Sequence, residues 1–344
     1  MEFINRIISF FLPGNNTQYT HSSSTTPIEV IGSNKPSTIS SWSSKNGNLY
    51  LQLEDKYYQY FIGVNSLMEV NLNSFEINVI KSLEKIIKRD QVLAKDIPRL
   101  PSIVPKLLHL LKTDDFNWKE VADIIASDPV ILVEIIKVAK SSAYNLKVKD
   151  EQLEHIIAKI GLLEVRIAIM KVALKPIMLF EGGHFLKHSG TKIWSHAVNT
   201  ALASRTLAEI YKYDPFDAYL AGILSNLGMV IVVKQLNKIK EFTIAPRSLQ
   251  FQEKLLKLSK KLSIKIADSW EMHPSIILAL TEQCHSNAKE IESALGDIVY
   301  EATTVSMEHI LVNKNLWLKK EHTDNEDEYM PFDKAYMKLD LLNF

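Results

Sequence analysis

Apolar residues recur at three- and four-residue intervals along most of the chain from residue 48 to about residue 313. This spacing places them on one face of an α-helix. The segments "YLQLEDKYYQYFIG" and "NSFEINVIKSLEKIIK" each predict one amphipathic helix. No stretch alternates apolar and polar residues between hairpin turns, and no repeat of fixed period is present. The pattern therefore predicts an all-α fold, a multi-helix bundle rather than a solenoid.

Local start and stop signals support this prediction. An Asp-Pro pair precedes two apolar runs, and this pair is typical of a helix N-cap followed by proline in the first turn. Gly161 follows another run and predicts a helix C-terminus. The expected caps are Ser74, Asn117 (with Glu120 completing a capping box), Asp128 before Pro129, Asp214 before Pro215, and His273.

Changes in composition divide the chain into five predicted segments. Residues 1–14 are a short apolar segment, 15–47 a Ser/Thr-rich linker expected to be disordered, 48–91 a helical N-terminal extension, 92–313 the main helical domain, and 314–344 an acidic tail. Residues 3–12 are too few to span a bilayer. We expect them to form a docked or frayed helix, and contact with a membrane surface is the alternative. The last apolar residues of the tail could dock back onto the bundle or onto another molecule.

Composition excludes several classes of function. Lys plus Arg and Asp plus Glu both number 40, so the formal net charge is zero and predicts no nucleic-acid partner. The Lys-rich zone 234–265 has lysines between apolar residues at helical spacing, which indicates a solvated helix face. A single cysteine, Cys284, fits a reducing compartment and a cytoplasmic location. No glycine-rich phosphate loop is present, so no nucleotide cofactor is predicted.

Few residues suggest chemistry on their own. His184 and His188 are four residues apart but lack the glutamate of a zinc protease motif, and their flanking glycines predict a loop. Cys284 and His285 are adjacent, so on a helix they would point in different directions. The apolar stretch "LAGILSNLGMVIV" contains Ser225 and Asn226, which must find hydrogen-bond partners if buried. No metal site follows from these patterns.

Several segments together resemble the HDOD family, a branch of the HD superfamily found in bacterial signalling proteins. "IPRLPSIVPKLL" is similar to its Leu-Pro-x-Leu-Pro opening, and "SDPVILVEIIKVAKSSAY" to its Asp-Pro-x-Leu helix, with Lys140 in place of an asparagine. "KIGLLEVR", "IWSHAVNTALASRTLA" and "AYLAGILSNLGMVIV" match further family segments in order and spacing. The residues that match the family pattern in a structural role are Pro98, Pro101, Asp128, Pro129, Gly161, Arg166, Gly222, Gly228, Trp270 and Pro274.

The resemblance also implies where a metal site would lie. In HD phosphohydrolases, two histidines and two aspartates hold divalent ions that polarise phosphate and activate water. Carried onto this chain, the first histidine is His196, the His-Asp pair falls on Ser225 and Asn226, and the later aspartate falls on Thr303. One of the four ligands is retained. The resemblance therefore implies a vestigial HD pocket without metal or catalysis, whose polar residues satisfy one another or a water.

These observations predict a non-catalytic regulatory module of bacterial signal transduction that acts through contacts with a protein partner. Two alternatives remain open. The pocket could bind a nucleotide or a phosphorylated metabolite without cleaving it, which would make the protein a sensor. It could also retain metal-dependent phosphohydrolase activity with unusual ligands.

Overall fold

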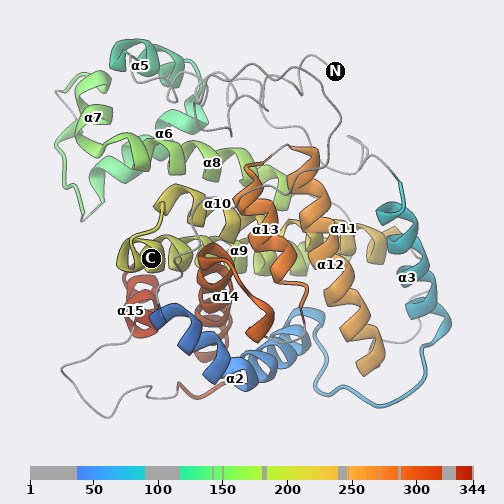
Figure 1. The fold of residues 1–344 in the computed structure, drawn as a ribbon. Helices are drawn as coiled ribbons and strands as arrows, with labels where there is room; N and C mark the ends of the chain where they lie inside the picture. Colours follow the sequence, from blue (N-terminus) through green and yellow to red (C-terminus); the bar gives the residue numbers. More distant parts are fainter. Residues whose placement is uncertain are drawn as a thin grey trace, which may run out of the picture.

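The fold is a bundle of helices, seen in the computed structural model of the chain (Figure 1). The structure describes residues 37–89, 117–141, 143–148, 151–179, 184–238, 246, 248–270, 272–285, 288–319 and 331–342. Within these ranges there is no β-strand, and an isolated bridge joins Met68 to Ser248. The predicted all-α fold is confirmed. The predictions for Pro98, Pro101 and the apolar segment 3–12 concern residues outside the described ranges.

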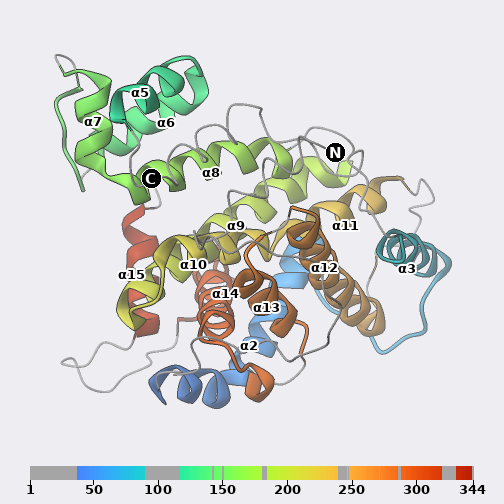
Figure 2. The ribbon, with the colours of Figure 1, turned by 45° about the horizontal axis from the view of Figure 1, so that its top comes forward.

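The N-terminal half contributes two extension helices and then a group of shorter helices. In Figures 1 and 2, α5, α6 and α7 form a lobe at one end of the molecule, and α8 connects this lobe to the main body. Lys171 of α8 and Glu134 of α6 form an ion pair of 2.7 Å inside this group. These helices are α2 (Ser37–Ile62), α3 (Ser74–Ile87), α5 (Trp118–Ala126), α6 (Pro129–Lys140), α7 (Leu153–Ile160) and α8 (Leu162–Met178).

The main body is organised around one long central helix, α9, which packs against α8, α10, α11, α14, α15 and α2. Both views show α2 across the end of the bundle near α14, and α3 at the edge beside α12. The remaining helices are α9 (His184–Tyr211), α10 (Pro215–Leu224), α11 (Leu227–Lys238), α12 (Leu249–Ser269), α13 (Pro274–Glu282), α14 (Ala294–Asn313) and α15 (Pro331–Leu342).

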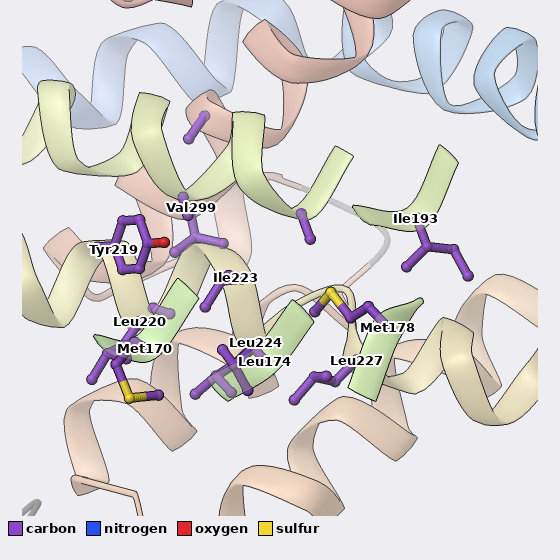
Figure 3. Close-up of a cluster of buried hydrophobic side chains, with 14 of the residues drawn as sticks. Met170, Leu174, Met178, Ile193, Tyr219, Leu220, Ile223, Leu224, Leu227 and Val299 are labelled. Atoms are coloured by element: carbon purple, nitrogen blue, oxygen red, sulfur yellow. The ribbon is translucent and has the colours of Figure 1, made fainter. Parts of the chain in front are cut away.

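A continuous apolar core lies between these helices. Figure 3 shows part of it, where side chains of α8, α9, α10, α11 and α14 meet. The stretch Pro215–Lys238 is apolar and long enough to cross a membrane by length and composition alone. In the structure it forms α10 and α11, and 78% of its most apolar window is buried inside the bundle. Core packing therefore accounts for its composition.

The predicted helix boundaries are mostly confirmed. Asp128 accepts hydrogen bonds from the backbone N–H groups of Val130 and Ile131, and Asp214 accepts one from Asp217. Gly161 follows α7 with a φ of 86°, a conformation that favours glycine. Pro274 opens α13 after the N-cap His273, as expected.

Four boundary predictions need correction. The N-cap of α3 is Asn73 rather than Ser74, because Asn73 forms a capping box with Glu76. Asn117 caps α5 through the N–H of Lys119, a single bond in place of the predicted capping box. The helix expected to begin at Asp150 begins at Leu153. The glycine-flanked loop predicted around 184–188 is instead the first part of α9.

The two ends of the described chain also differ from the predicted segments. The helix α2 begins at Ser37, so residues 37–47 continue a helix that was expected to start at Asn48. Extending a helix that is already nucleated and packed costs far less than starting one, which explains why a polar stretch can join it. At the other end, α15 docks back onto the bundle and buries Phe332, Tyr336 and Leu339. Of the two options for the tail, docking back onto the bundle is thus the observed one.

Close helix packing at Gly228 generates a prediction about stability. A Cβ atom at this position would lie 1.8 Å from the backbone oxygen of Ser259 on α12. We expect Gly228→Ala to lower the free energy of unfolding by about 2 kcal/mol or more, since backbone atoms cannot move aside cheaply. Urea denaturation followed by circular dichroism measures this change.

Gly47→Ala is the matched control. Gly47 lies within α2, and the nearest atom to an added Cβ would be the Tyr300 hydroxyl at 3.9 Å. We expect it to be neutral or stabilising by up to ~1 kcal/mol, because alanine is the better helix former. Equal stability of Gly228→Ala and the parent protein would show that α11 and α12 are not in close contact.

Candidate functional site

The four residues of the predicted vestigial pocket line one cavity of about 80 Å³. His196 comes from α9, Ser225 and Asn226 from the turn between α10 and α11, and Thr303 from α14. Side chains of α2 and α12 complete the walls, among them Tyr57 and Lys260. The structure therefore brings together residues that are more than 100 positions apart in the sequence.

His196 is buried and electrically neutral. Its side chain is 7% exposed, and burial lowers its pKa to about 3. The Nδ1 atom lies 2.7 Å from the Ser306 hydroxyl, and that hydroxyl donates to the backbone oxygen of His196 at 3.2 Å. The imidazole is therefore hydrogen-bonded to Ser306 through Nδ1 in either tautomer.

Ser225 and Asn226 satisfy each other and their own helix. The Ser225 hydroxyl donates to the backbone oxygen of Gly222 at 2.7 Å, and the Asn226 amide donates to the Ser225 hydroxyl at 3.0 Å. The expected mutual hydrogen bonding is therefore found for this pair. It does not extend to His196, which pairs with Ser306 instead. Ser306 lies on α14, one helical turn beyond Thr303. It is 110 residues from His196 in the sequence, so no local pattern could reveal this pairing.

The cavity does not fit a divalent metal ion. Thr303 donates its hydroxyl to the Val299 backbone oxygen at 2.7 Å, so it too is engaged within its own helix. The carboxylate that lines the cavity, Glu54, is 2.9 Å from the ammonium group of Lys260. Transition ions prefer several imidazole, thiolate or carboxylate ligands. Among the described residues, no group of three or more such side chains is placed to hold a metal.

The helix α2 forms part of the cavity wall, and the sequence patterns did not predict this role. Its aromatic side chains Tyr50, Tyr57, Tyr58 and Phe61 line the cavity together with Glu54. The Tyr57 ring lies 4.5 Å from the imidazole of His196, centroid to centroid. The only signal in the sequence was the concentration of aromatic residues in "YLQLEDKYYQYFIG". Its meaning depends on contacts with distant helices.

The remaining family-motif residues have structural positions. A Cβ on Gly222 would lie 2.6 Å from the Ser204 hydroxyl, so this glycine allows α10 to approach α9. The Arg166 guanidinium lies over the Phe216 ring at 5.7 Å. Trp270 follows the last turn of α12 as its C-cap. The pair noted at Cys284 and His285 forms no site, since His285 is largely exposed and pairs with Glu290 at 2.8 Å.

Fold and site together define an all-α bundle with a small cavity that is lined by the four residues of the predicted pocket. The sequence model of the HDOD domain family matches residues 97–286, more than half of the chain. The chain therefore belongs to the HDOD family. This match begins later and ends earlier than the predicted domain of residues 92–313.

The chain is similar to solved structures from several organisms. One is a "Putative metal-dependent phosphohydrolase" from Shewanella amazonensis SB2B, 20% identical, with a TM-score of 0.56 over 78% of this chain and 98% of that chain. Another is an "HDOD domain protein with unknown function" from Geobacter sulfurreducens, 18% identical, with a TM-score of 0.49 over 76% of this chain and 88% of that one.

A third is a "Putative signal transduction protein" from Marinobacter aquaeolei VT8, 17% identical, with a TM-score of 0.47 over 80% of this chain and 64% of that one. No curated protein matches the chain at a significant level. At these identities, the similarity to the Shewanella protein shows a shared fold and nothing more.

A buried carboxyl group on α14 provides a pH-dependent prediction. Burial, together with the nearby Asp297 carboxylate, raises the pKa of Glu301 to about 8 despite a hydrogen bond from the Tyr211 hydroxyl. In the unfolded chain this pKa is about 4.3. The folded protein therefore holds a proton that the unfolded chain releases between these pH values. Stability is lost as the pH rises through that window, by at most ~1.4 kcal/mol per pH unit from this group.

We expect Glu301→Gln to remove this loss, because the neutral amide can still accept the Tyr211 hydroxyl. The variant and the parent protein should be similarly stable near pH 5, and the variant should be the more stable one at pH 9. Thermal denaturation at a series of pH values measures the difference. A difference that is constant from pH 5 to pH 9 would contradict a raised pKa for this group.

Proposed function

We propose that this protein is a non-catalytic regulatory module of bacterial signal transduction, which acts in the cytoplasm through contacts with a protein partner. The observation that carries the proposal is the state of the polar groups in the cavity. The Ser225 and Thr303 hydroxyls donate to backbone oxygens of their own helices, and the Nδ1 atom of His196 is hydrogen-bonded to Ser306. These hydrogen bonds support a structural role for residues whose counterparts in HD enzymes bind metal.

The size of the cavity weighs against the sensor alternative in this conformation. Pockets for drug-sized ligands and cofactors commonly enclose ~300–1,000 Å³. The cavity around His196 encloses about 80 Å³. A nucleotide would therefore need the walls of the cavity to move apart before it could fit. Residual hydrolysis would need a metal, for which these side chains are poor ligands.

Metal content and hydrolysis test the proposal directly. Protein purified from cells grown with added manganese and iron should contain much less than one equivalent of metal. Its hydrolysis of bis(p-nitrophenyl) phosphate should equal that of His196→Ala, with an active HD-family enzyme as the positive control. In a strain that lacks the gene for this protein, the His196→Ala variant should restore the regulated response as well as the parent protein does. Stoichiometric metal, or hydrolysis lost in His196→Ala, would overturn the proposal.

A partial reconstruction of the HD motif should also fail to bind metal. The double variant Ser225→His with Asn226→Asp supplies a His-Asp pair beside His196. The fourth position remains Thr303, whose hydroxyl is engaged with Val299, and the Lys260 ammonium lines the same cavity. We expect no tight manganese binding by isothermal titration calorimetry.

The triple variant that adds Thr303→Asp is the informative comparison, because it supplies the second carboxylate. Binding that appears in the triple variant and is absent from the double variant would support the assignment of Thr303. Tight binding by the double variant would show that the fourth ligand lies at another position.

A further inference from the structure

The helix α2 lies in a groove formed by α9, α12 and α14, and one ion pair lies near the middle of this contact. The Glu54 carboxylate is 2.9 Å from the ammonium group of Lys260 on α12. The Tyr50 hydroxyl donates to the same carboxylate at 2.9 Å and lies 3.3 Å from Lys260. The groove thus presents a cation that requires an acidic partner from α2.

Aromatic rings occupy the groove on both sides of this ion pair. The Tyr50 ring stacks on Tyr300 of α14, with centroids 4.3 Å apart and planes 18° apart. The Tyr57 ring packs against His196 of α9, and its hydroxyl donates to the backbone oxygen of Lys192 at 3.1 Å. The contact therefore follows a definite pattern along α2: aromatic, acidic, aromatic, at residues 50, 54 and 57.

The contact of α2 with the bundle combines fully buried side chains, such as Leu53 and Tyr58, with two features that reduce its stability. A cavity of about 80 Å³ lies beside α2, and unfilled volume removes favourable contacts from its walls. The partly buried ion pair contributes less net stability than an apolar contact of the same volume, because both charges lose part of their hydration. Both features favour local opening of α2.

The chain after α2 allows this helix to move without the next one. Gly63 has a φ of 79°, and no atom lies within 4 Å of the position of a Cβ on it. From Met68 onward the chain is held again, since the Leu249 N–H donates to the Met68 oxygen at 3.0 Å. The helix α3 has its own anchors, among them the hydrogen bond of 2.9 Å from Ser82 to Gln235. Residues 63–67 thus form a short hinge between α2 and a fixed α3.

We propose that the groove of α9, α12 and α14 is a binding site for a helix of a partner protein, and that α2 is its internal occupant. The chemistry of α2 describes the partner: an amphipathic helix with an aromatic residue, a carboxylate four residues later and a second aromatic residue three residues after that. Recognition of a helix in a groove commonly uses such i, i+4, i+7 anchors. This inference rests on the proposed function, because it names the kind of partner through which the module acts.

Because residues 63–67 keep α2 close to the groove, a partner helix must compete with α2 for it. A short flexible linker gives its attached segment an effective concentration in the millimolar range. A partner helix must therefore bind more tightly than α2 does, or α2 must first be weakened. Weakening the contact by one substitution provides the means to test the proposal in the full-length chain.

Hydrogen exchange measured by mass spectrometry tests the opening of α2. We expect Glu54→Gln to speed exchange of the amides in residues 49–62 about tenfold or more, and to leave α9 and α14 unchanged. Glu84→Gln on the exposed face of α3 is the matched control and should change neither. The charge-reversed pair Glu54→Lys with Lys260→Glu should restore protection, which separates loss of the ion pair from general damage.

Hydrogen exchange of the parent protein tests the opening of α2 without relying on any variant to fold. Its α2 amides should exchange through a local opening that responds less to added denaturant than exchange in α14. Equal protection and equal denaturant dependence in α2 and α14 would make α2 a permanent part of the core and overturn the proposal. Because this experiment does not involve metal or hydrolysis, its failure would leave the non-catalytic proposal standing.

A labelled synthetic peptide of residues 37–62 then tests the partner chemistry. We expect it to bind the Glu54→Gln chain, as measured by fluorescence anisotropy, and a peptide carrying Glu54→Gln to bind at least tenfold more weakly. Equal binding of the two peptides, or no binding although α2 opens, would overturn the assigned partner. A dimer of the Glu54→Gln chain seen by light scattering would identify a second copy as the occupant and also overturn it.

Discussion

The hydroxyl group of Ser263 on α12 holds the turn between α10 and α11 in place. It accepts a hydrogen bond from the Gly228 N–H and donates one to the Ser225 backbone oxygen, both at 2.8 Å. This bridge requires α11 to touch α12 through a glycine, because any Cβ would strike the Ser259 oxygen. The position of Ser225 and Asn226 in the cavity follows from this contact. The backbone geometry of the turn therefore does not depend on what the two side chains bind.

That separation explains how the side chains at this turn can vary while the bundle around it stays intact. Buried hydroxyl and amide groups need hydrogen-bond partners, and the helix supplies them as backbone oxygens within one turn. Ser225 and Thr303 both use this local solution, and His196 uses Ser306 on the neighbouring α14. The Ser225 and Thr303 hydroxyls and the His196 Nδ1 atom are thus satisfied by the protein, whereas the buried Tyr58 hydroxyl, which also lines the cavity, has no hydrogen-bond partner among the described residues.

The sequence predicted what depends on neighbouring residues. Asp128 before Pro129 and Asp214 before Pro215 cap helices through atoms two or three positions away, and both caps are present. The meeting of His196, Ser225, Asn226 and Thr303 followed from a family pattern rather than from spacing. The partner of Glu54 lies 206 residues away, and no local pattern encodes such a pairing. The early start of α2 was missed for the same reason, since its polar first turns extend a segment stabilised by tertiary contacts.

The balance of charge in the cavity links these features. An HD enzyme places two carboxylates where the positive charge of a metal offsets them. In this chain the corresponding positions are neutral, and burial lowers the pKa of His196 far enough to keep it neutral as well. One cation, Lys260, and one anion, Glu54, remain, and they neutralise each other across the boundary between the bundle and α2. The anion of this pair comes from α2, a helix outside the HDOD match, and the cation from α12 inside it. Docking of α2 therefore completes the charge balance of the cavity, because a partly buried Lys260 without Glu54 would be costly.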